Sequence, residues 1–188
     1  MKNSINSIEI HKARLIGTFF LLAFLAYGIG RNLLESGSIS EKNIGAILVI
    51  ANSIMVLLIG VYLRKTLLNY NVLVGNIYLI TRAFESIALA SSVFNLISTI
   101  QISDFYGYFP AMLVLGLGSI PMCFTFYKYK ISPSWLAIWG IIGYSAFAFG
   151  FLMELFGKQW SMYFLAPGAL WEITFAVWLI IKGGQKTK

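Results

Sequence analysis

Three ionisable side chains stand inside long apolar runs of the sequence, where charge is costly. Arg82 and Glu85 lie near the middle of the run 72–98, and Glu172 lies near the middle of the run 165–181. At the centre of a bilayer one such residue costs about 2.5–3.5 kcal/mol, so intramembrane charges pair with one another and often handle ions, protons or solutes. These three side chains are therefore the first candidates for chemistry in this chain.

The spacing around Arg82 predicts one polar face on a helix. Arg82 and Glu85 are three residues apart, which brings both side chains to the same side of a helix. Tyr78 and Ser86 fall on the same broad face at the helical period. We predict that Arg82 is shared between Glu85 and Glu172, and that Tyr78 and Ser86 complete a candidate intramembrane polar site.

The surroundings of Glu172 indicate which helices meet. Gly168, Ala169 and Ala176 lie on its face, and small residues allow two helices to approach closely in lipid. We expect the third and sixth helices to meet there. One arginine cannot neutralise two carboxylates, which leaves open whether Glu85 or Glu172 carries a proton. The cluster is either a binding site or a buried polar lock that fixes helix register.

The elements that must position these residues follow from composition. Of the 188 residues 59% are hydrophobic and 11% are charged, whereas soluble domains carry about 25% charged residues. A bilayer-spanning helix needs roughly 20 apolar residues. The sequence therefore predicts an all-α fold, a polytopic membrane bundle of six transmembrane helices that forms a single domain over 1–188. The expected spans are approximately 13–30, 44–63, 72–98, 110–127, 135–156 and 165–181.

Basic residues predict the orientation in the membrane. One side of the expected bundle collects ten basic residues and the other side three, and Arg82 lies within a span. Cytoplasmic loops are rich in Lys and Arg, so both termini are expected in the cytoplasm and the protein in the cell membrane. The first run is also compatible with a cleaved signal peptide, but its 18 residues exceed the usual apolar region of about 7–15 residues. We expect it to be retained.

The sequence excludes several kinds of chemistry. A single cysteine, Cys123, prevents an intramolecular disulfide, and a single histidine, His11, excludes bis-histidine haem and three-histidine zinc sites. The net charge of +7 is explained by the loop bias rather than by nucleic acid. We assign no cofactor, no metal and no catalytic residue.

Helix breakers and one further carboxylate leave alternatives open. Gly116, Gly118 and Pro121 lie close together in the fourth run, and Pro167 lies at the head of the sixth. Each group is either a simple proline kink, which we favour, or an unwound segment that binds substrate as in some transporters. Glu154 lies near the outer end of the fifth run, which favours an interfacial carboxylate.

Four short segments carry a resemblance to a known family. They are Ala13–Gly17 (ARLIG), Arg82–Glu85 (RAFE), Pro133–Leu136 (PSWL) and Pro167–Glu172 (PGALWE). With them the chain resembles the bacterial membrane proteins grouped as the domain of unknown function 4386 family, over nearly its whole length. The resemblance implies a six-helix integral membrane domain. It carries no established activity, so it transfers no catalytic residue.

Three classes of function remain from the sequence. The first is a membrane protein that handles a small solute, ion or proton through Arg82, Glu85 and Glu172. The alternative is a non-catalytic accessory or regulatory subunit in which the same residues form a structural lock. The third is a membrane enzyme with Glu85 and Glu172 as acid and base, which is the least favoured. The expected partners are the lipid bilayer and, for the first class, a small solute or ion; the sequence leaves the oligomeric state open.

Overall fold

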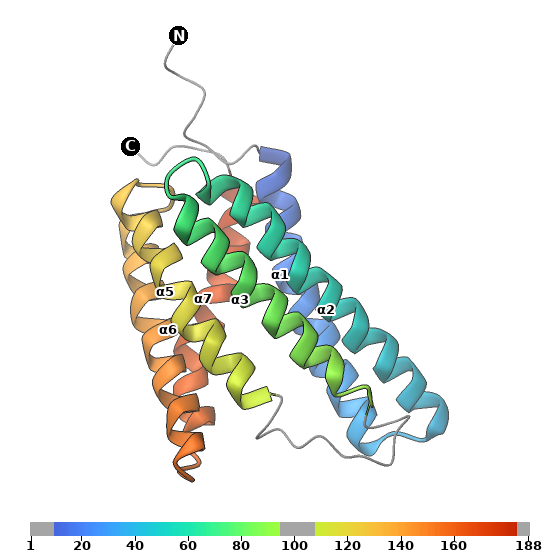
Figure 1. Ribbon diagram of the computed structural model, residues 1–188. Helices are drawn as coiled ribbons and strands as arrows, with labels where there is room; N and C mark the ends of the chain where they lie inside the picture. The colour runs from blue at the N-terminus through green and yellow to red at the C-terminus, as the bar shows by residue number, and fades with distance from the viewer. Residues whose placement is uncertain (1–9, 95–107, 184–188) are drawn as a thin grey trace.

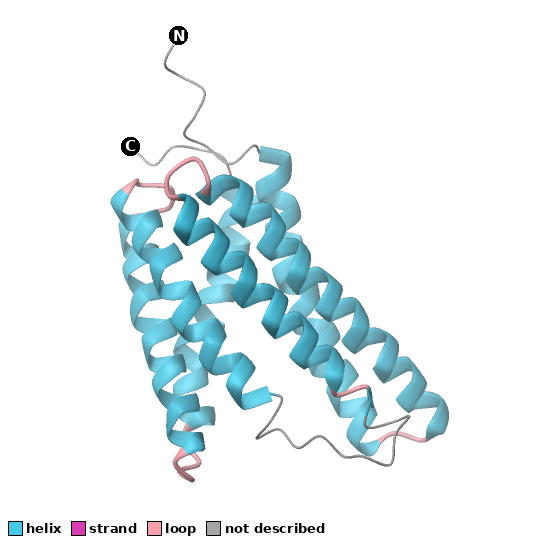
Figure 2. Ribbon diagram, viewed as in Figure 1, coloured by secondary structure: helices cyan, strands magenta, loops and turns pink. Residues whose placement is uncertain are grey.

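The structure is a computed structural model that describes residues 10–94 and 108–183. Within these residues the chain is all helical, with six long helices and no strand (Figures 1 and 2). The helices are α1 (Ile10–Ser36), α2 (Ile39–Leu67), α3 (Val72–Ser91), α5 (Tyr108–Lys128), α6 (Ser134–Leu155) and α7 (Ser161–Lys182). Each helix is long and apolar enough to cross a membrane, which confirms the expected six spans.

The third helix is shorter than its apolar run. The run continues to residue 98, but α3 ends at Ser91 and a turn follows at Ser92 and Val93. The hydroxyls of Ser91 and Ser92 donate 2.7 Å hydrogen bonds to the carbonyls of Ala88 and Leu89. Such local bonds compete with the helical ladder and favour a helix end. Residues 95–98 lie outside the described residues.

The six helices form a closed ring in chain order. Each helix packs against the next one, and α7 packs against α1 to close the ring. Neighbouring helices run antiparallel, so α1 begins and α7 ends at the same end of the bundle (Figure 1). We call this the terminal end, and the end at which α1 ends and α5 begins the distal end. In this order α3 lies opposite α7, and α1 lies opposite α5.

Glycines allow the closest approaches between neighbouring helices. A Cβ added to Gly30 of α1 would lie 3.0 Å from the carbonyl oxygen of Gly45 of α2, and one on Gly45 would lie 2.8 Å from that of Gly30. At the closure of the ring, a Cβ on Gly17 would lie 2.5 Å from the carbonyl oxygen of Ala176. Close backbone approach is a main source of helix association in lipid, so these contacts stabilise the ring.

The terminal half of the bundle has a closely packed apolar core. Its fully buried side chains come from five helices: Ala13, Ile16, Leu63, Leu67, Phe126, Leu136, Phe175 and Leu179. Cys123 is buried in the same half as a free thiol. The outer surface is apolar as well, with an exposed aliphatic side chain available on every helix: Leu25, Ile47, Ile80, Leu117, Ile142 and Leu170. A bundle that is apolar on both its inside and its outside is typical of membrane helices.

Neither proline interrupts its helix. α5 runs continuously through Gly116, Gly118 and Pro121, and α7 runs continuously through Pro167. The alternative of an unwound, substrate-binding segment is therefore wrong at both places. The hydroxyl of Thr125 donates a 2.8 Å hydrogen bond to the Pro121 carbonyl, and such hydroxyl contacts help membrane helices to tolerate proline.

Glu154 lies near the distal end of α6, where the sequence favoured an interfacial carboxylate. Its Oε1 atom accepts hydrogen bonds from the Ser161 backbone N–H at 3.1 Å and from the Ser161 hydroxyl at 2.6 Å. These bonds satisfy orphan donors at the start of α7. Glu154 therefore connects two helices at their ends and takes no part in the central cluster.

Candidate functional site

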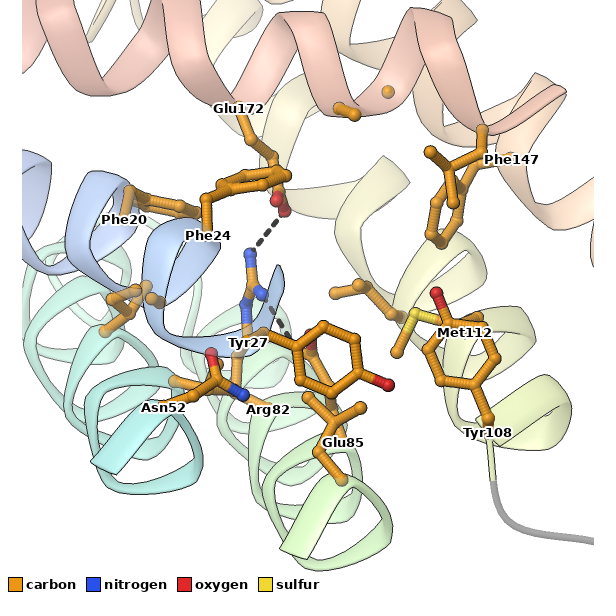
Figure 3. Close-up of a pocket in the computed structure, with 18 of the residues that line it drawn as sticks. Phe20, Phe24, Tyr27, Asn52, Arg82, Glu85, Tyr108, Met112, Phe147 and Glu172 are labelled. Carbon is orange, nitrogen blue, oxygen red and sulfur yellow. Dashed lines mark hydrogen bonds and ion pairs between the residues drawn. The ribbon is translucent and has the colours of Figure 1, made fainter. Parts of the chain in front are cut away.

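Arg82 lies in the middle of α3 and faces the centre of the ring, with only 2% of its surface exposed. Each of its three nitrogens donates to a protein oxygen, and Figure 3 shows the bonds to Glu85 and Glu172. Nε donates to the Tyr78 hydroxyl at 2.8 Å, Nη1 to Oε2 of Glu85 at 2.9 Å, and Nη2 to Oε1 of Glu172 at 2.9 Å. The prediction that Arg82 is shared between the two glutamates is confirmed. We call Arg82, Glu85 and Glu172 the charged cluster.

The bond to Glu172 crosses the ring, and this corrects one expectation. The third and sixth helices, α3 and α7, are opposite one another and are not packed as neighbours. The small residues beside Glu172 serve other contacts: a Cβ on Gly168 would lie 3.4 Å from the carbonyl of Gly143 in α6, and Ala176 faces Gly17 of α1. Because both side chains are long, Arg82 and Glu172 join the two helices without close backbone packing.

A glycine packs against the stem of Arg82, and two aromatic rings lie beside its guanidinium. Gly60 of α2 leaves room for the arginine stem, since a Cβ there would lie 2.7 Å from the Arg82 Cβ. The guanidinium carbon lies 5.2 Å from the ring centroid of Phe20 and 5.3 Å from that of Tyr78. Cation–π contact of this kind adds to the ion pairs when water is excluded.

Tyr144 of α6 is a fourth member of the network that the sequence reasoning missed. Its hydroxyl donates a 2.6 Å hydrogen bond to Oε1 of Glu172, the oxygen that also accepts from Arg82. The sequence did contain a signal for Tyr144. This polar side chain lies in the middle of the fifth apolar run, four residues after Gly140 and therefore on the same helix face. Tyr144 thus holds the Glu172 carboxylate from the α6 side.

Ser86 is not brought to the charged cluster. Its hydroxyl donates a 2.7 Å hydrogen bond to the Ser53 carbonyl and thereby ties α3 to α2. Ser86 follows Glu85 directly, and one residue turns the side chain by about 100° around the helix. Of the predicted site residues, Arg82, Glu85, Glu172 and Tyr78 come together, whereas Ser86 has a separate contact.

A cavity of about 250 Å³ extends from the charged cluster into the distal half of the bundle, and all six helices line it. Its polar lining residues are Asn52, Arg82, Glu85, Tyr144 and Glu172, and its aromatic ones include Phe20, Phe24, Tyr27, Tyr108 and Phe147. In the distal half, the rings of Tyr27 and Tyr108 stack from opposite helices with centroids 6.1 Å apart. Apolar side chains fill the terminal half, so the cavity lies towards the distal end.

Asn52 contributes a buried amide nitrogen that lacks a partner among the described residues. It lies in the middle of α2, is 2% exposed and lines the cavity (Figure 3). Its Nδ2 atom forms no hydrogen bond within the described part of the chain. Buried polar groups almost always have a partner, so such an atom beside a cavity indicates a place for a water or a ligand. The sequence reasoning missed Asn52, although a lone asparagine inside an apolar run is a visible signal.

The second oxygens of the two glutamates are also available. Among residues 10–94 and 108–183, no protein donor bonds Oε1 of Glu85 or Oε2 of Glu172. In the same residues no group of three His, Cys, Asp or Glu side chains is placed to hold a metal ion. The arrangement therefore offers hydrogen-bond acceptors beside a cavity, in an apolar and aromatic environment.

The C-terminal half of the chain, which carries Glu172 of the charged cluster, matches a known family. Residues 101–183 match the family model of the domain of unknown function DUF4386. The match confirms the resemblance over these residues, which include the segments Pro133–Leu136 and Pro167–Glu172. The segments Ala13–Gly17 and Arg82–Glu85 lie outside the match. The DUF4386 match covers α5, α6 and α7, and so includes Tyr144 and Glu172, whereas Arg82 and Glu85 precede it. Searches of curated proteins and of solved structures found no match.

Proposed function

We propose that this membrane protein binds a small solute, ion or proton in the cavity that the charged cluster lines. One observation carries the proposal: Arg82, Glu85 and Glu172, which pair inside the bundle, also line a cavity. Protein interiors are close-packed, with few voids larger than a water molecule. A lock that only fixes helix register needs no such space.

The unpartnered polar atoms support binding further. Asn52, Glu85 and Glu172 line the same cavity. Nδ2 of Asn52 and the second carboxylate oxygens of Glu85 and Glu172 lack protein partners within the described residues. Leaving such atoms unsatisfied costs about 1–3 kcal/mol each, and a ligand or water that bonds them recovers this free energy. Polar groups that converge in an apolar pocket are typical of ligand sites.

The expected orientation of the bundle indicates from which side of the membrane the ligand reaches the proposed site. The excess of basic residues at the terminal end favours cytoplasmic termini. The cavity lies towards the opposite, distal end, so the proposed site receives its ligand from the outer side or the outer leaflet.

A second candidate is an accessory or regulatory subunit, and one observation favours it. All three nitrogens of Arg82 already bond protein oxygens, which is the arrangement that a structural lock requires. In that case the charged cluster sets the register of α3 against α7, and the cavity has no functional ligand. No specific contact favours the third class, a membrane enzyme.

Native mass spectrometry of the gently extracted protein tests the proposal. We expect a retained small molecule in the wild type and its loss in Glu172→Gln, which keeps the shape of the side chain but removes its charge. The matched control is Glu35→Gln, at an exposed carboxylate on the distal end of α1. A bound second protein without any small molecule, together with a Glu172→Gln protein that unfolds as readily as Arg82→Met, supports the accessory subunit instead.

A further inference from the structure

We propose that the ligand of this cavity is a small organic cation, namely a primary amine attached to a single apolar or aromatic ring. Its ammonium group lies between Glu85 and Glu172, and its ring lies among the aromatic side chains of the distal half. The inference rests on the proposed function and names the ligand class for that same site.

The balance of charge around the cavity is the first argument. Two carboxylates face one guanidinium, and the lining residues that the structure describes include no second cation. With both carboxylates ionised, the cluster carries one net negative charge in surroundings where charges are weakly screened. A bound monovalent cation balances that charge, whereas an anion would add a third negative group around Arg82.

The hydrogen-bonding capacity left in the site is the second argument. The nitrogens of Arg82 already donate to Tyr78, Glu85 and Glu172, so the groups left over at the cluster are the acceptor oxygens Glu85 Oε1 and Glu172 Oε2. An ammonium group has three donors and no acceptor, so it complements these oxygens. Asn52 lines the same cavity. Rotation of its side-chain amide by about 180° places the carbonyl oxygen, which is an acceptor, where the unpartnered nitrogen lies. This oxygen is a third acceptor for an ammonium group.

The shape and lining of the cavity indicate the rest of the ligand. Phe24, Tyr27, Tyr108 and Phe147 surround the space beyond the charged cluster (Figure 3). Aromatic faces attract cations and pack well against flat apolar groups. A cavity of about 250 Å³ exceeds the roughly 150 Å³ that holds benzene. It is smaller than the 300–1,000 Å³ or so of pockets for drug-sized ligands, so the size fits one ring with a short arm.

Calorimetric titration of the purified protein in lipid nanodiscs at neutral pH tests this inference with three probes of similar shape. Benzylamine carries the ammonium group, benzyl alcohol is its neutral analogue, and phenylacetate is an anion. We expect benzylamine to bind at least about tenfold more tightly than benzyl alcohol, since a hydrogen bond to a charged group contributes more than the free energy of one decade in Kd. We expect phenylacetate not to bind.

Single substitutions test whether benzylamine binds in the cavity. Glu85→Gln and Glu172→Gln are each expected to weaken benzylamine binding about tenfold or more. Glu35→Gln, at a residue that does not line the cavity, should bind as the wild type does. The thermal midpoint of each variant is measured alongside. If a glutamine variant does not fold, Asn52→Leu replaces it, because it removes a polar partner of the ligand without removing a charge.

The outcomes separate this inference from the proposed function. Preferential binding of phenylacetate or benzyl alcohol overturns the amine class and leaves a solute-binding function standing. Failure of benzylamine to bind, or binding that Glu85→Gln, Glu172→Gln and Asn52→Leu all leave unchanged, overturns the inference as well. If native mass spectrometry in addition finds no retained small molecule, the proposed function fails with it.

Discussion

Arg82 of α3 donates a 2.9 Å hydrogen bond to Glu172 of α7 across the centre of the six-helix ring. The two residues are 90 positions apart in the chain, and their helices are opposite members of the ring. On the α3 side the same guanidinium bonds Glu85, and on the α6 side Tyr144 bonds the same oxygen of Glu172. One ion pair therefore connects both halves of the bundle at the base of the cavity.

Removal of the arginine is expected to destabilise the bundle strongly. Arg82→Met leaves Glu85 and Glu172 without their cation in a buried position, and breaking a buried ion pair in this way costs about 3–5 kcal/mol. The expected result is a clear fall in the thermal midpoint in detergent. The triple variant Arg82→Met, Glu85→Gln, Glu172→Gln is the control, and it should recover most of the lost stability because no charge remains buried. An Arg82→Met protein as stable as the wild type contradicts the central role of the ion pair.

Replacement of Asn52 is expected to stabilise the protein, in contrast to the replacement of Arg82. Asn52→Leu keeps a similar volume and removes a buried amide without a protein partner, which should raise the free energy of unfolding by about 1–3 kcal/mol. The same variant should weaken ligand binding. Asn76→Leu is the matched control: Oδ1 of Asn76 accepts a 2.9 Å hydrogen bond from Nε of Arg64, so this change should lower stability. Equal destabilisation by both changes, seen in thermal unfolding, argues against a free amide at Asn52.

The closure of the ring between α1 and α7 predicts a difference between two glycines of the same helix. A methyl group on Gly17 would lie 2.5 Å from the Ala176 carbonyl oxygen, whereas a methyl group on Gly28 meets no atom within 4 Å. Gly17→Ala should therefore destabilise the protein by about 1–3 kcal/mol through overpacking. Gly28→Ala should leave stability unchanged or raise it, because alanine favours the helix. Similar thermal midpoints for both variants count against the close α1–α7 contact.

The orientation is testable with single cysteines at opposite ends of the bundle. Ser38 lies in the exposed turn between α1 and α2 at the distal end, and Asn69 lies in the exposed turn between α2 and α3 at the terminal end. A membrane-impermeant thiol reagent added to intact cells should label Ser38→Cys and spare Asn69→Cys. The native Cys123 is buried and gives little background. Labelling of Asn69→Cys alone reverses the orientation and turns the cavity towards the cytoplasm.

Local patterns were enough to predict the helices and the central ion pairs. Hydrophobic runs of about 20 residues have few ways to satisfy their backbone in lipid other than a helix, so six runs predicted six helices. The cost of buried charge made Arg82, Glu85 and Glu172 conspicuous and required them to pair. Tyr78 and Glu85 could be placed beside Arg82 because all three residues share one helix face, which depends only on their spacing along the chain. These inferences depend on neighbours along the chain or on a large energetic penalty, and both are visible in the sequence.

The tertiary structure decided which helices are neighbours and which face each other. The small residues around Glu172 predicted a close helix partner, but that partner is α6 on one side and α1 on the other, while α3 lies across the ring. Many helix pairs can use the same small residues, because apolar packing in lipid has little directional preference. The ring order therefore depends on all six helices together. The same holds for the cavity, for Tyr144 and for Asn52: an ordinary tyrosine or asparagine in a span becomes part of a site only when other helices leave space beside it.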